Sequence, residues 1–396
     1  WNLGSFPAGF TPDEASFGYD AYSILKTGRD QWGESFPLTF RSFGDFKAPL
    51  YTYLTVPFVV VFGLNEFAVR LPNALLGVLA VLVTYLLATE LSKFTSKESK
   101  PTFEVLFPLF AALLLAISPW HLSLSRGAFE ANLTTFLMPL GIYAFLKGFD
   151  NPRWMLLSTL AFGLNLFSYH SAKLITPLIV LILLWSKRKE LTTILPSAVV
   201  KIAGVIFVLF LGYSVLQSLG GASSRATDIG IFNPTGGWGA VSDRRYEAVQ
   251  SGLPDEVSRL FSNKIAYTGS EFIKNYLSYL SPTFLFTQGA GEATYGMIPG
   301  HGVLYLFELP FVLAAIWMVV KKPGPATRGI LLIIVWILLS PIPAALTKGP
   351  GFAANRIAVM MPAIQILSAY GGVLLFKWLK ENFKFQISNF KLLPLL

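Results

Sequence analysis

The sequence predicts an all-α membrane protein with about nine spans, and three observations support this prediction. Of the 396 residues, 53% are hydrophobic and only 13% are charged, whereas soluble domains carry roughly 25% charged residues. Apolar runs of membrane-spanning length recur along the chain. The basic residues between these runs gather in alternate loops, as they do in polytopic membrane proteins. A single helical domain embedded in a bilayer explains all three observations.

Residues 1–65 precede the first long apolar run and form a predicted external loop with two helices. Thr11 and Pro12 are typical of a helix start, and the pattern predicts a helix over residues 13–27. Residues 49–63 are apolar enough to cross the bilayer, but a span there would reverse the charge pattern of every later loop. We therefore expect this second run to lie in the interface. The expected apolar members of the first helix are Ala15, Phe17, Ala21, Tyr22 and Leu25.

Transmembrane helices are predicted within 66–219 and again within 299–396, where the chain ends in a basic tail. The runs are about 66–92, 103–120, 129–147, 153–169, 172–186, 194–219, 300–320, 327–346 and 355–377. The fourth and fifth runs are short, so one bent helix is an alternative there. Residues 220–298 form a large external loop, which we expect to pack over the membrane-embedded core. Within this loop the apolar residues recur at helical spacing, which predicts a helix; they are Val257, Leu260, Phe261 and Ile265.

Most of the basic residues between these runs fall on one side of the membrane if the spans alternate. They are Lys93, Lys97, Lys100, Lys147, Arg153, Lys187, Arg188, Lys189, Lys321, Lys322, Arg328, Lys377, Lys380, Lys384 and Lys391. The positive-inside rule places this set in the cytoplasm and the 1–65 and 220–298 loops outside. The same excess of basic residues in cytoplasmic loops, which also favours contact with anionic lipids, accounts for the net charge of +9. We therefore expect no nucleic-acid partner. Because the first span then starts outside, we expect one further span before Trp1.

Asp13 and Glu14 are the first candidate catalytic residues. A carboxylate at an apolar surface beside another acid can act as a general base, because both surroundings favour proton uptake. The pair also fits a purely structural role at a helix start, and both interpretations stay open. Glu130 is a third candidate, which would face Asp13 across a cavity. Alternatively, Glu130 forms an ion pair with Arg126 four residues earlier.

Lys47, Arg70, Lys173 and Arg356 are cations at the external ends of apolar runs. The positive-inside rule depletes this side of cations, and those that remain tend to line a functional cavity. Together they can bind a phosphate, for which arginine offers two parallel hydrogen bonds. Snorkelling toward lipid headgroups is the alternative role. Two histidines on the same side, His170 and His301, are placed to hydrogen-bond to a substrate.

The sequence offers little support for metal or soluble nucleotide chemistry. It lacks cysteine, which excludes disulfides and thiolate metal sites. It also lacks a glycine-rich phosphate loop, a GxSxG motif and an HExxH motif. Three carboxylates can hold a divalent cation, but no spacing here demands one. We therefore expect neither a cofactor nor a resident metal ion.

Five short motifs, in this order and all on the predicted external side, resemble those of the GT-C glycosyltransferases. They are Asp13-Glu14, then Lys47-Ala48-Pro49-Leu50-x-x-Tyr53 with Phe67-x-x-Arg70-Leu71-Pro72, then Ser125-Arg126-x-x-x-Glu130, and finally Asn355-Arg356 followed by Pro362. The nearest likeness is to glycosyltransferase family 39, which includes protein O-mannosyltransferases, and to the aminoarabinose transferases. Three departures stand out. The family often has proline at position 48, aspartate at position 130 and arginine at position 173.

The resemblance implies a GT-C-like bundle in a bacterial or archaeal cell membrane, with its active site on the external face. Such enzymes move one sugar from a polyprenyl-phosphate carrier to an acceptor hydroxyl on a glycan, lipid or protein, here by direct inverting displacement. It implies Asp13 as base, Glu14 in support and Glu130 orienting a substrate. The carrier phosphate and lipid would contact Lys47, Arg70, Arg126, His170, Lys173 and Arg356. The competing hypotheses are a lipid-linked polysaccharide polymerase or ligase centred on 220–298, and a transporter or flippase.

Overall fold

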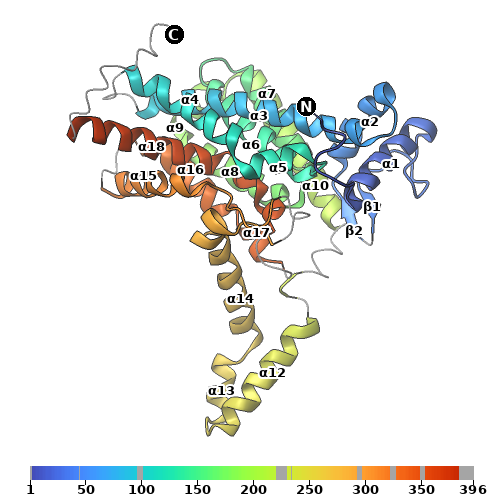
Figure 1. The fold of residues 1–396 in the computed structure, drawn as a ribbon, viewed down its shortest axis with the longest axis vertical. Helices are drawn as coiled ribbons and strands as arrows, with labels where there is room; N and C mark the ends of the chain where they lie inside the picture. The colour runs from blue at the N-terminus through green and yellow to red at the C-terminus, as the bar shows by residue number, and fades with distance from the viewer. Residues whose placement is uncertain are drawn as a thin grey trace.

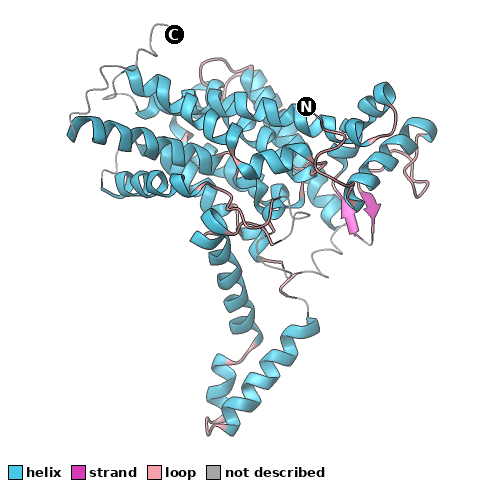
Figure 2. Ribbon diagram, viewed as in Figure 1, coloured by secondary structure: helices cyan, strands magenta, loops and turns pink. Residues whose placement is uncertain are grey.

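The computed structural model describes residues 2–43, 45–95, 101–219, 230–232, 234–291, 297–321, 327–347 and 353–382. Helices dominate these ranges (Figures 1 and 2), and their only sheet is a two-stranded hairpin. This agrees with the predicted all-α class. Long helices pack side by side in one bundle, the first external loop covers one end of it, and a helical hairpin projects from its side.

The first external loop begins with α1 (Pro12–Thr27), whose start follows the prediction. Thr11 Oγ1 accepts a hydrogen bond from the Glu14 N–H at 3.2 Å, and the Glu14 carboxylate accepts one from the Thr11 N–H at 2.9 Å. This reciprocal capping box satisfies two N–H groups at the helix end. The antiparallel strands β1 (Phe40–Ser42) and β2 (Asp45–Lys47) follow, and then α2 (Pro49–Phe62).

The buried face of α1 differs from the predicted one. Phe17 and Ala21 are buried as expected, but the other three predicted members, Ala15, Tyr22 and Leu25, are exposed. The inner face instead follows Glu14, Phe17, Ala21 and Ile24. An acidic residue takes an inner position because it forms an ion pair inside the protein, which a count of apolar residues does not detect.

Helices of the bundle cover all nine predicted apolar runs. They are α3 (Glu66–Thr95), α4 (Pro101–Ile117), η2 (Glu130–Asn132), α6 (Leu133–Lys147), α7 (Trp154–Asn165), α8 (His170–Ser186), α10 (Ala198–Leu219), η5 (Leu306–Glu308), α15 (Leu309–Lys321), α16 (Arg328–Leu339), α17 (Ile342–Ala345), η7 (Ala354–Met360) and α18 (Ala363–Asn382). Three further elements, α5 (Pro119–Arg126), α9 (Arg188–Ile194) and η3 (Thr283–Thr287), lie mostly between these runs. The structure separates α7 from α8, so the alternative of one bent helix over 153–186 is wrong.

The number of membrane spans stays a prediction. Among the described residues, 2 helices, Glu66–Lys93 and Ala198–Ser218, are long and apolar enough to cross a bilayer alone. The number rises to as many as 5 if each of 3 bent helix pairs counts as one span. Shorter apolar helices lie at Pro49–Phe62, Trp154–Asn165 and Gly329–Ala345.

Close helix contacts hold the bundle together. At Gly371, α18 approaches α15 so closely that a Cβ atom would overlap the carbonyl oxygen of Phe311. Gly141 of α6 packs against the ring of Phe162 on α7, and Ser158 Oγ donates to the Gly141 carbonyl at 2.9 Å. Small residues at such crossings allow backbones to meet, which is a common device between membrane helices.

One end of the bundle gathers basic residues from three successive loops. Lys93 and Lys147 both contact the carboxylate of Glu90, at 2.8 Å and 3.4 Å. Lys187 lies over the ring of Phe149, with its Nζ 5.7 Å from the ring centre. The loops after α3, α6 and α8 therefore lie on the same side, as the charge pattern predicts.

The 220–298 segment packs on the core in part and projects from it in part. Tyr279, Phe284 and Met297 are buried in the main core, as expected. The projecting helices are α12 (Pro234–Gln250), α13 (Asp255–Phe261) and α14 (Lys264–Tyr279). Figure 1 shows α14 leaving the bundle near α17, with α12 and α13 at its far end, as a hairpin that projects away from the other helices. Helical spacing correctly predicts α13 and α14, but their apolar residues Leu260, Phe261 and Ile265 are exposed.

Candidate active site

Glu14 of α1 and Arg70 of α3 form a buried ion pair that joins the first external loop to the bundle. Arg70 Nε lies 2.7 Å from Glu14 Oε1, and Nη2 lies 3.0 Å from Oε2. Glu14 Oε1 also accepts from the Ala128 N–H at 3.1 Å. Burial disfavours the charged carboxylate, but these hydrogen bonds and the Arg70 charge outweigh it and hold the pKa of Glu14 below its ordinary value.

The remaining N–H groups of Arg70 point to backbone carbonyls. Nη1 donates to the oxygens of Leu3 and Pro7 at 3.1 Å and 3.0 Å, and Nη2 donates to the oxygen of Gly9. All five guanidinium N–H groups are thereby used within the protein. In this geometry Arg70 and Glu14 bind each other and the backbone, which is a structural arrangement. The phosphate-binding role of Arg70 and the supporting catalytic role of Glu14 stay predictions.

Asp13, the neighbour of Glu14, faces the opposite way and opens onto a cavity. Its Oδ1 lies 2.7 Å from Lys47 Nζ, and the two side chains are 70% and 7% exposed respectively. The Lys47 ammonium also lies over the ring of Phe17, 4.4 Å from its centre, which stabilises the buried cation. Of the two adjacent acids, Glu14 thus belongs to a buried ion pair and Asp13 to a solvent-accessible one.

The cavity has a volume of about 220 Å³ and unites three of the predicted site residues. Asp13 and Lys47 come from the first external loop, and Glu130 comes from η2, between α5 and α6. Glu130 is buried, and it shares the cavity with Asp13 as one of the two alternatives predicts. The other lining residues are Phe17, Ser42, Phe43, Ala128, Phe129, Ala131, Tyr169 and Asn355.

Two further predicted cations lie close to this cavity. Lys173, in the first turn of α8, interacts electrostatically with the carboxylate of Glu130. Arg356 follows the lining residue Asn355 in η7, and its Nη1 donates to Thr347 Oγ1 at 2.8 Å. Lys173 therefore lies near Glu130, and Arg356 is the chain neighbour of a residue that lines the cavity.

Three predicted contacts lie outside the cavity lining. His170 Nε2 contacts the carbonyl oxygen of Phe46 at 2.9 Å, so it ties α8 to the strand that carries Lys47. Arg126 donates to the Phe6 carbonyl at 3.1 Å and faces the loop before α1. His301 is exposed and contacts the Pro299 carbonyl at 3.4 Å. Direct substrate contact by these residues stays a prediction.

Some lining residues carry no signal in the sequence. Ser42 and Phe43 reach the cavity because the β1–β2 turn folds beside α1, and Phe43 has a φ of 47°, which is unusual for a residue other than glycine. Asn355 and Tyr169 each neighbour a predicted residue, so proximity to Arg356 and His170 was the available clue. Within the described ranges, no three His, Cys, Asp or Glu side chains come together to hold a metal ion.

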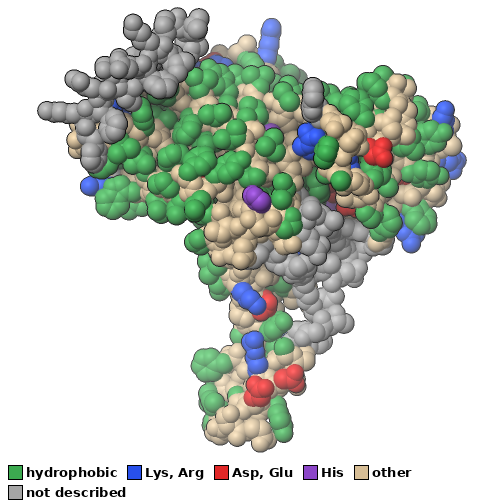
Figure 3. Space-filling view, viewed as in Figure 1, with side chains coloured by type: hydrophobic (Ala, Val, Ile, Leu, Met, Phe, Trp, Pro, Cys, Tyr) green, Lys and Arg blue, Asp and Glu red, His purple; other side chains and the backbone are tan. Residues whose placement is uncertain are grey.

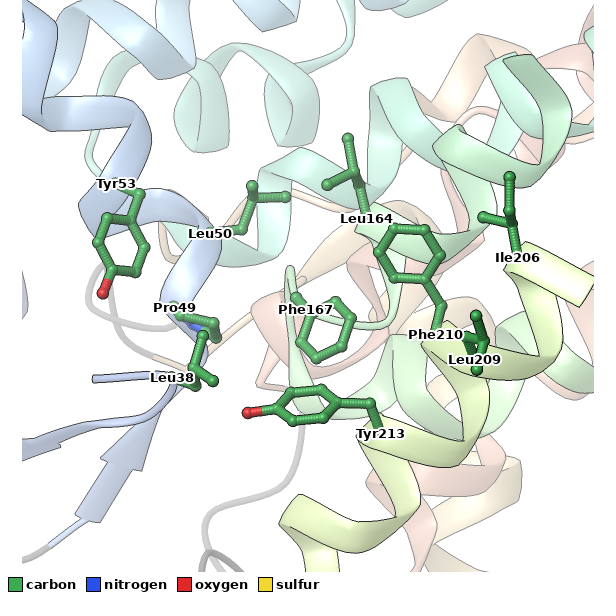
Figure 4. Close-up of a pocket in the computed structure, with 10 residues that line it drawn as sticks. All are labelled: Leu38, Pro49, Leu50, Tyr53, Leu164, Phe167, Ile206, Leu209, Phe210 and Tyr213. Atoms are coloured by element: carbon green, nitrogen blue, oxygen red, sulfur yellow. The ribbon is translucent and has the colours of Figure 1, made fainter. Parts of the chain in front are cut away.

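An apolar groove of about 460 Å³ lies on the other side of the turn that follows Lys47. Figure 4 shows Pro49 and Leu50 on one wall, Phe167 between the walls, and Phe210 and Tyr213 on the other. The Leu50 N–H donates to the Phe167 carbonyl at 3.2 Å, which closes the floor between α2 and the end of α7. A single turn of the chain thus separates a polar cavity from a groove lined almost wholly by apolar atoms.

Comparisons with known proteins agree with this arrangement. Residues 46–213 match the family model described as dolichyl-phosphate-mannose-protein mannosyltransferase. The "Putative mannosyltransferase YycA" of Bacillus subtilis (strain 168) is 26% identical over 185 residues, which cover 45% of this chain and 25% of that protein.

Two solved structures share the fold. ArnT from Cupriavidus metallidurans, solved with undecaprenyl phosphate, aligns with a TM-score of 0.52 and 16% identity over 91% of this chain and 56% of its own. The oligosaccharyltransferase AglB from Archaeoglobus fulgidus, solved with an inhibitory peptide and a dolichol-phosphate, aligns with a TM-score of 0.52 and 17% identity over 95% of this chain and 48% of its own. The chain therefore spans about half the length of these structures.

The chain therefore shares the fold of ArnT and AglB, as the resemblance to the GT-C glycosyltransferases implies, and over residues 46–213 it is similar to the family described as dolichyl-phosphate-mannose-protein mannosyltransferase.

Proposed function

We propose that this chain transfers a sugar from a polyprenyl-phosphate donor to an acceptor hydroxyl on the external face of the membrane. The observation that carries the proposal is the division at Lys47. On one side lies a cavity with an acid and a cation 2.7 Å apart, and on the other lies the apolar groove. A lipid-linked phosphate needs both surroundings, since its chain requires apolar contact and its leaving phosphate requires positive charge.

In this mechanism, Asp13 accepts the proton of the acceptor hydroxyl while that oxygen attacks the anomeric carbon. The bond between the anomeric carbon and the phosphate oxygen breaks, and the lipid phosphate leaves with the electron pair. Lys47 and Arg356 stabilise the negative charge of the leaving phosphate. Glu130 and Lys173 orient the sugar. When the phosphate binds Lys47, it competes with Asp13 for the ammonium and frees the carboxylate to act as base.

Two observations support this proposal, one from similar structures and one from the cavity itself. The ArnT structure contains undecaprenyl phosphate and the AglB structure contains a dolichol-phosphate, so this fold accommodates such lipids. The polymerase or ligase hypothesis centres on residues 220–298, yet none of the described residues lining the cavity comes from that segment. The transferase is therefore the better-supported of the two.

The test is Asp13→Asn in protein purified and reconstituted into nanodiscs with polyprenyl-phosphate sugars. We expect transfer of radiolabelled sugar to fall at least a hundredfold, because a positioned base contributes roughly 10²–10⁴-fold, while the melting temperature stays unchanged. Asp150→Asn, at the basic end of the bundle, is the matched control and should keep full activity. Full activity of Asp13→Asn would remove the base assignment. Mass spectrometry of co-purified prenyl lipid would identify the donor head group.

A further inference from the structure

The hairpin of α12, α13 and α14 leaves the bundle at the end that carries the cavity. Asn275 Nδ2 of α14 donates to the carbonyls of Ala345 and Thr347, at 3.3 Å and 3.4 Å. The same Thr347 accepts a hydrogen bond from Arg356 at 2.8 Å. The base of the hairpin is therefore attached to the backbone that positions Arg356.

From this base the hairpin runs sideways. Figure 1 shows α15 and α18 lying across the view and α14 running down it, away from the bundle. If α15 and α18 cross the membrane, a helix in this orientation at their outer end lies along the membrane surface. The direction of α14 therefore fits neither a helix that crosses the bilayer nor a helix that projects away from it.

One face of the hairpin is apolar and exposed. Phe261 and Ile265 are 76% and 87% exposed, and Leu260, Ile273 and Leu277 are exposed as well. On α14, Ile265, Ile273 and Leu277 share one side, whereas Lys264 and Glu271 occupy the opposite side. Burying each such apolar side chain is worth roughly 1.5–3 kcal/mol, so leaving five in water sacrifices a large stabilisation.

The apolar face continues the lipid-facing surface of the bundle. Tyr276 Oη of α14 donates to the Leu338 carbonyl of α16 at 2.7 Å. Leu331 and Leu338 of α16 are themselves exposed. Figure 3 shows hydrophobic side chains spread over the visible face of the bundle and recurring along the projecting hairpin. A surface that joins a transmembrane helix to an amphipathic one is covered most simply by the same lipid.

The charge of the hairpin indicates whether anionic headgroups or the apolar part of the leaflet attracts it. Between residues 234 and 279 the chain has five basic and five acidic residues. Arg259 pairs with Asp255 at 2.7 Å, and Arg244 lies 5.8 Å from the ring centre of Tyr267. With balanced charge, anionic headgroups offer little attraction, so apolar burial supplies the binding.

We propose that the α12–α14 hairpin is an interfacial anchor, whose apolar face on α13 and α14 lies in the lipid of the leaflet next to the cavity. The anchor holds the Thr347 backbone, and with it Arg356, at the level of the headgroups. The phosphate of a lipid-linked substrate in that leaflet would then lie at the same depth in the membrane as Arg356.

The test uses single cysteines, because the natural sequence has none. Ile265→Cys and Leu277→Cys report the apolar face, and Lys264→Cys and Glu271→Cys are matched controls on the opposite, polar face. Each is labelled with an environment-sensitive fluorophore in nanodiscs of phosphatidylcholine, with and without anionic lipid. We expect blue-shifted emission and strong quenching by lipids with a nitroxide near the headgroup only for the first pair, in both lipid mixtures. The control pair should instead be quenched by aqueous iodide.

Equal quenching by iodide at all four positions would overturn the proposal, as would blue-shifted emission that nitroxide lipids leave unchanged. The second result would indicate a protein partner, and loss of the shift at one chain per nanodisc would identify that partner as a second copy. Neither measurement requires transfer activity, so the proposed membrane anchor and the proposed transferase function are tested independently.

Discussion

At the scale of single residues, Glu14 and Asp13 show how neighbouring acids acquire different roles. Glu14 lies inside, bonded to Arg70 and to two backbone N–H groups, whereas Asp13 opens onto the cavity beside Lys47. Removing one partner of a buried ion pair leaves the other charge uncompensated, which is strongly destabilising. The two acids therefore predict different mutant phenotypes, one in stability and one in transfer.

Glu14→Gln should lower the free energy of unfolding by about 3 kcal/mol or more at pH 7. The folded-state pKa of Glu14 is lowered, so its ionised form stabilises the fold above the ordinary glutamate pKa. That contribution disappears as the pH falls below about 4 toward the lowered pKa. Thermal unfolding in detergent between pH 7 and pH 3.5 should show the gap between wild type and variant narrowing in acid. Glu66→Gln, at an exposed position, is the control, and a gap independent of pH would contradict the assignment.

The sequence could identify Asp13, Lys47 and Glu130 as a group, since charged residues at the external ends of apolar runs are costly and therefore informative. It could not tell Asp13 from Glu14 in the same way. Which acid turns inward depends on Arg70 and on the Ala128 N–H, which lies 114 positions away. The partners of Arg70 could not be predicted for the same reason, because its five N–H groups find carbonyl and carboxylate oxygens that only the folded chain brings together.

At the scale of elements, α8 and the β1–β2 hairpin depend on one another through His170. Its contact with the Phe46 carbonyl fixes the strand next to Lys47, so His170 is a positioning residue. His170→Ala should raise KM for the lipid donor several-fold and change kcat less. His170→Gln should restore much of the loss, since its amide can donate to the same carbonyl. An equal fall in kcat for both variants would instead indicate direct participation.

The crossing of α15 and α18 makes a second prediction at this scale. Gly371→Ala places a Cβ against the Phe311 backbone, which cannot move aside as a flexible side chain would. Overpacking of this kind costs about 1–3 kcal/mol, so the melting temperature should fall. Gly204→Ala on α10 meets nothing within 4 Å and should change stability by less than about 1 kcal/mol. Similar melting temperatures for the two variants would refute the close packing.

Helix positions follow from apolar runs, and this part of the fold could be predicted because burial in lipid dictates both length and composition. The direction of the α12–α14 hairpin could not. Its apolar spacing fits a helix packed on a protein core as well as one lying on lipid, and only the contacts of Asn275 and Tyr276 decide where it leaves the bundle.

At the scale of the whole molecule, the two ends of the bundle differ in charge. Lys93, Lys147 and Lys187 meet at one end, and the cavity with Asp13 and Glu130 lies at the other. This separation supports the predicted orientation. Single cysteines at Gly33 and Gly239 should react with an impermeant maleimide added outside intact cells, whereas one at Asp150 should react only after permeabilisation. Labelling of all three from outside would contradict the orientation.

The contact between Glu14 and Ala128 has a consequence for biogenesis. A ribosome adding about 5–20 residues per second needs on the order of ten seconds to extend the chain between these positions. If the first loop crosses the membrane, as the charge pattern predicts, it does so before the backbone that completes its bonding has been synthesised. An early segment of this chain would then be among the last to complete its hydrogen bonds.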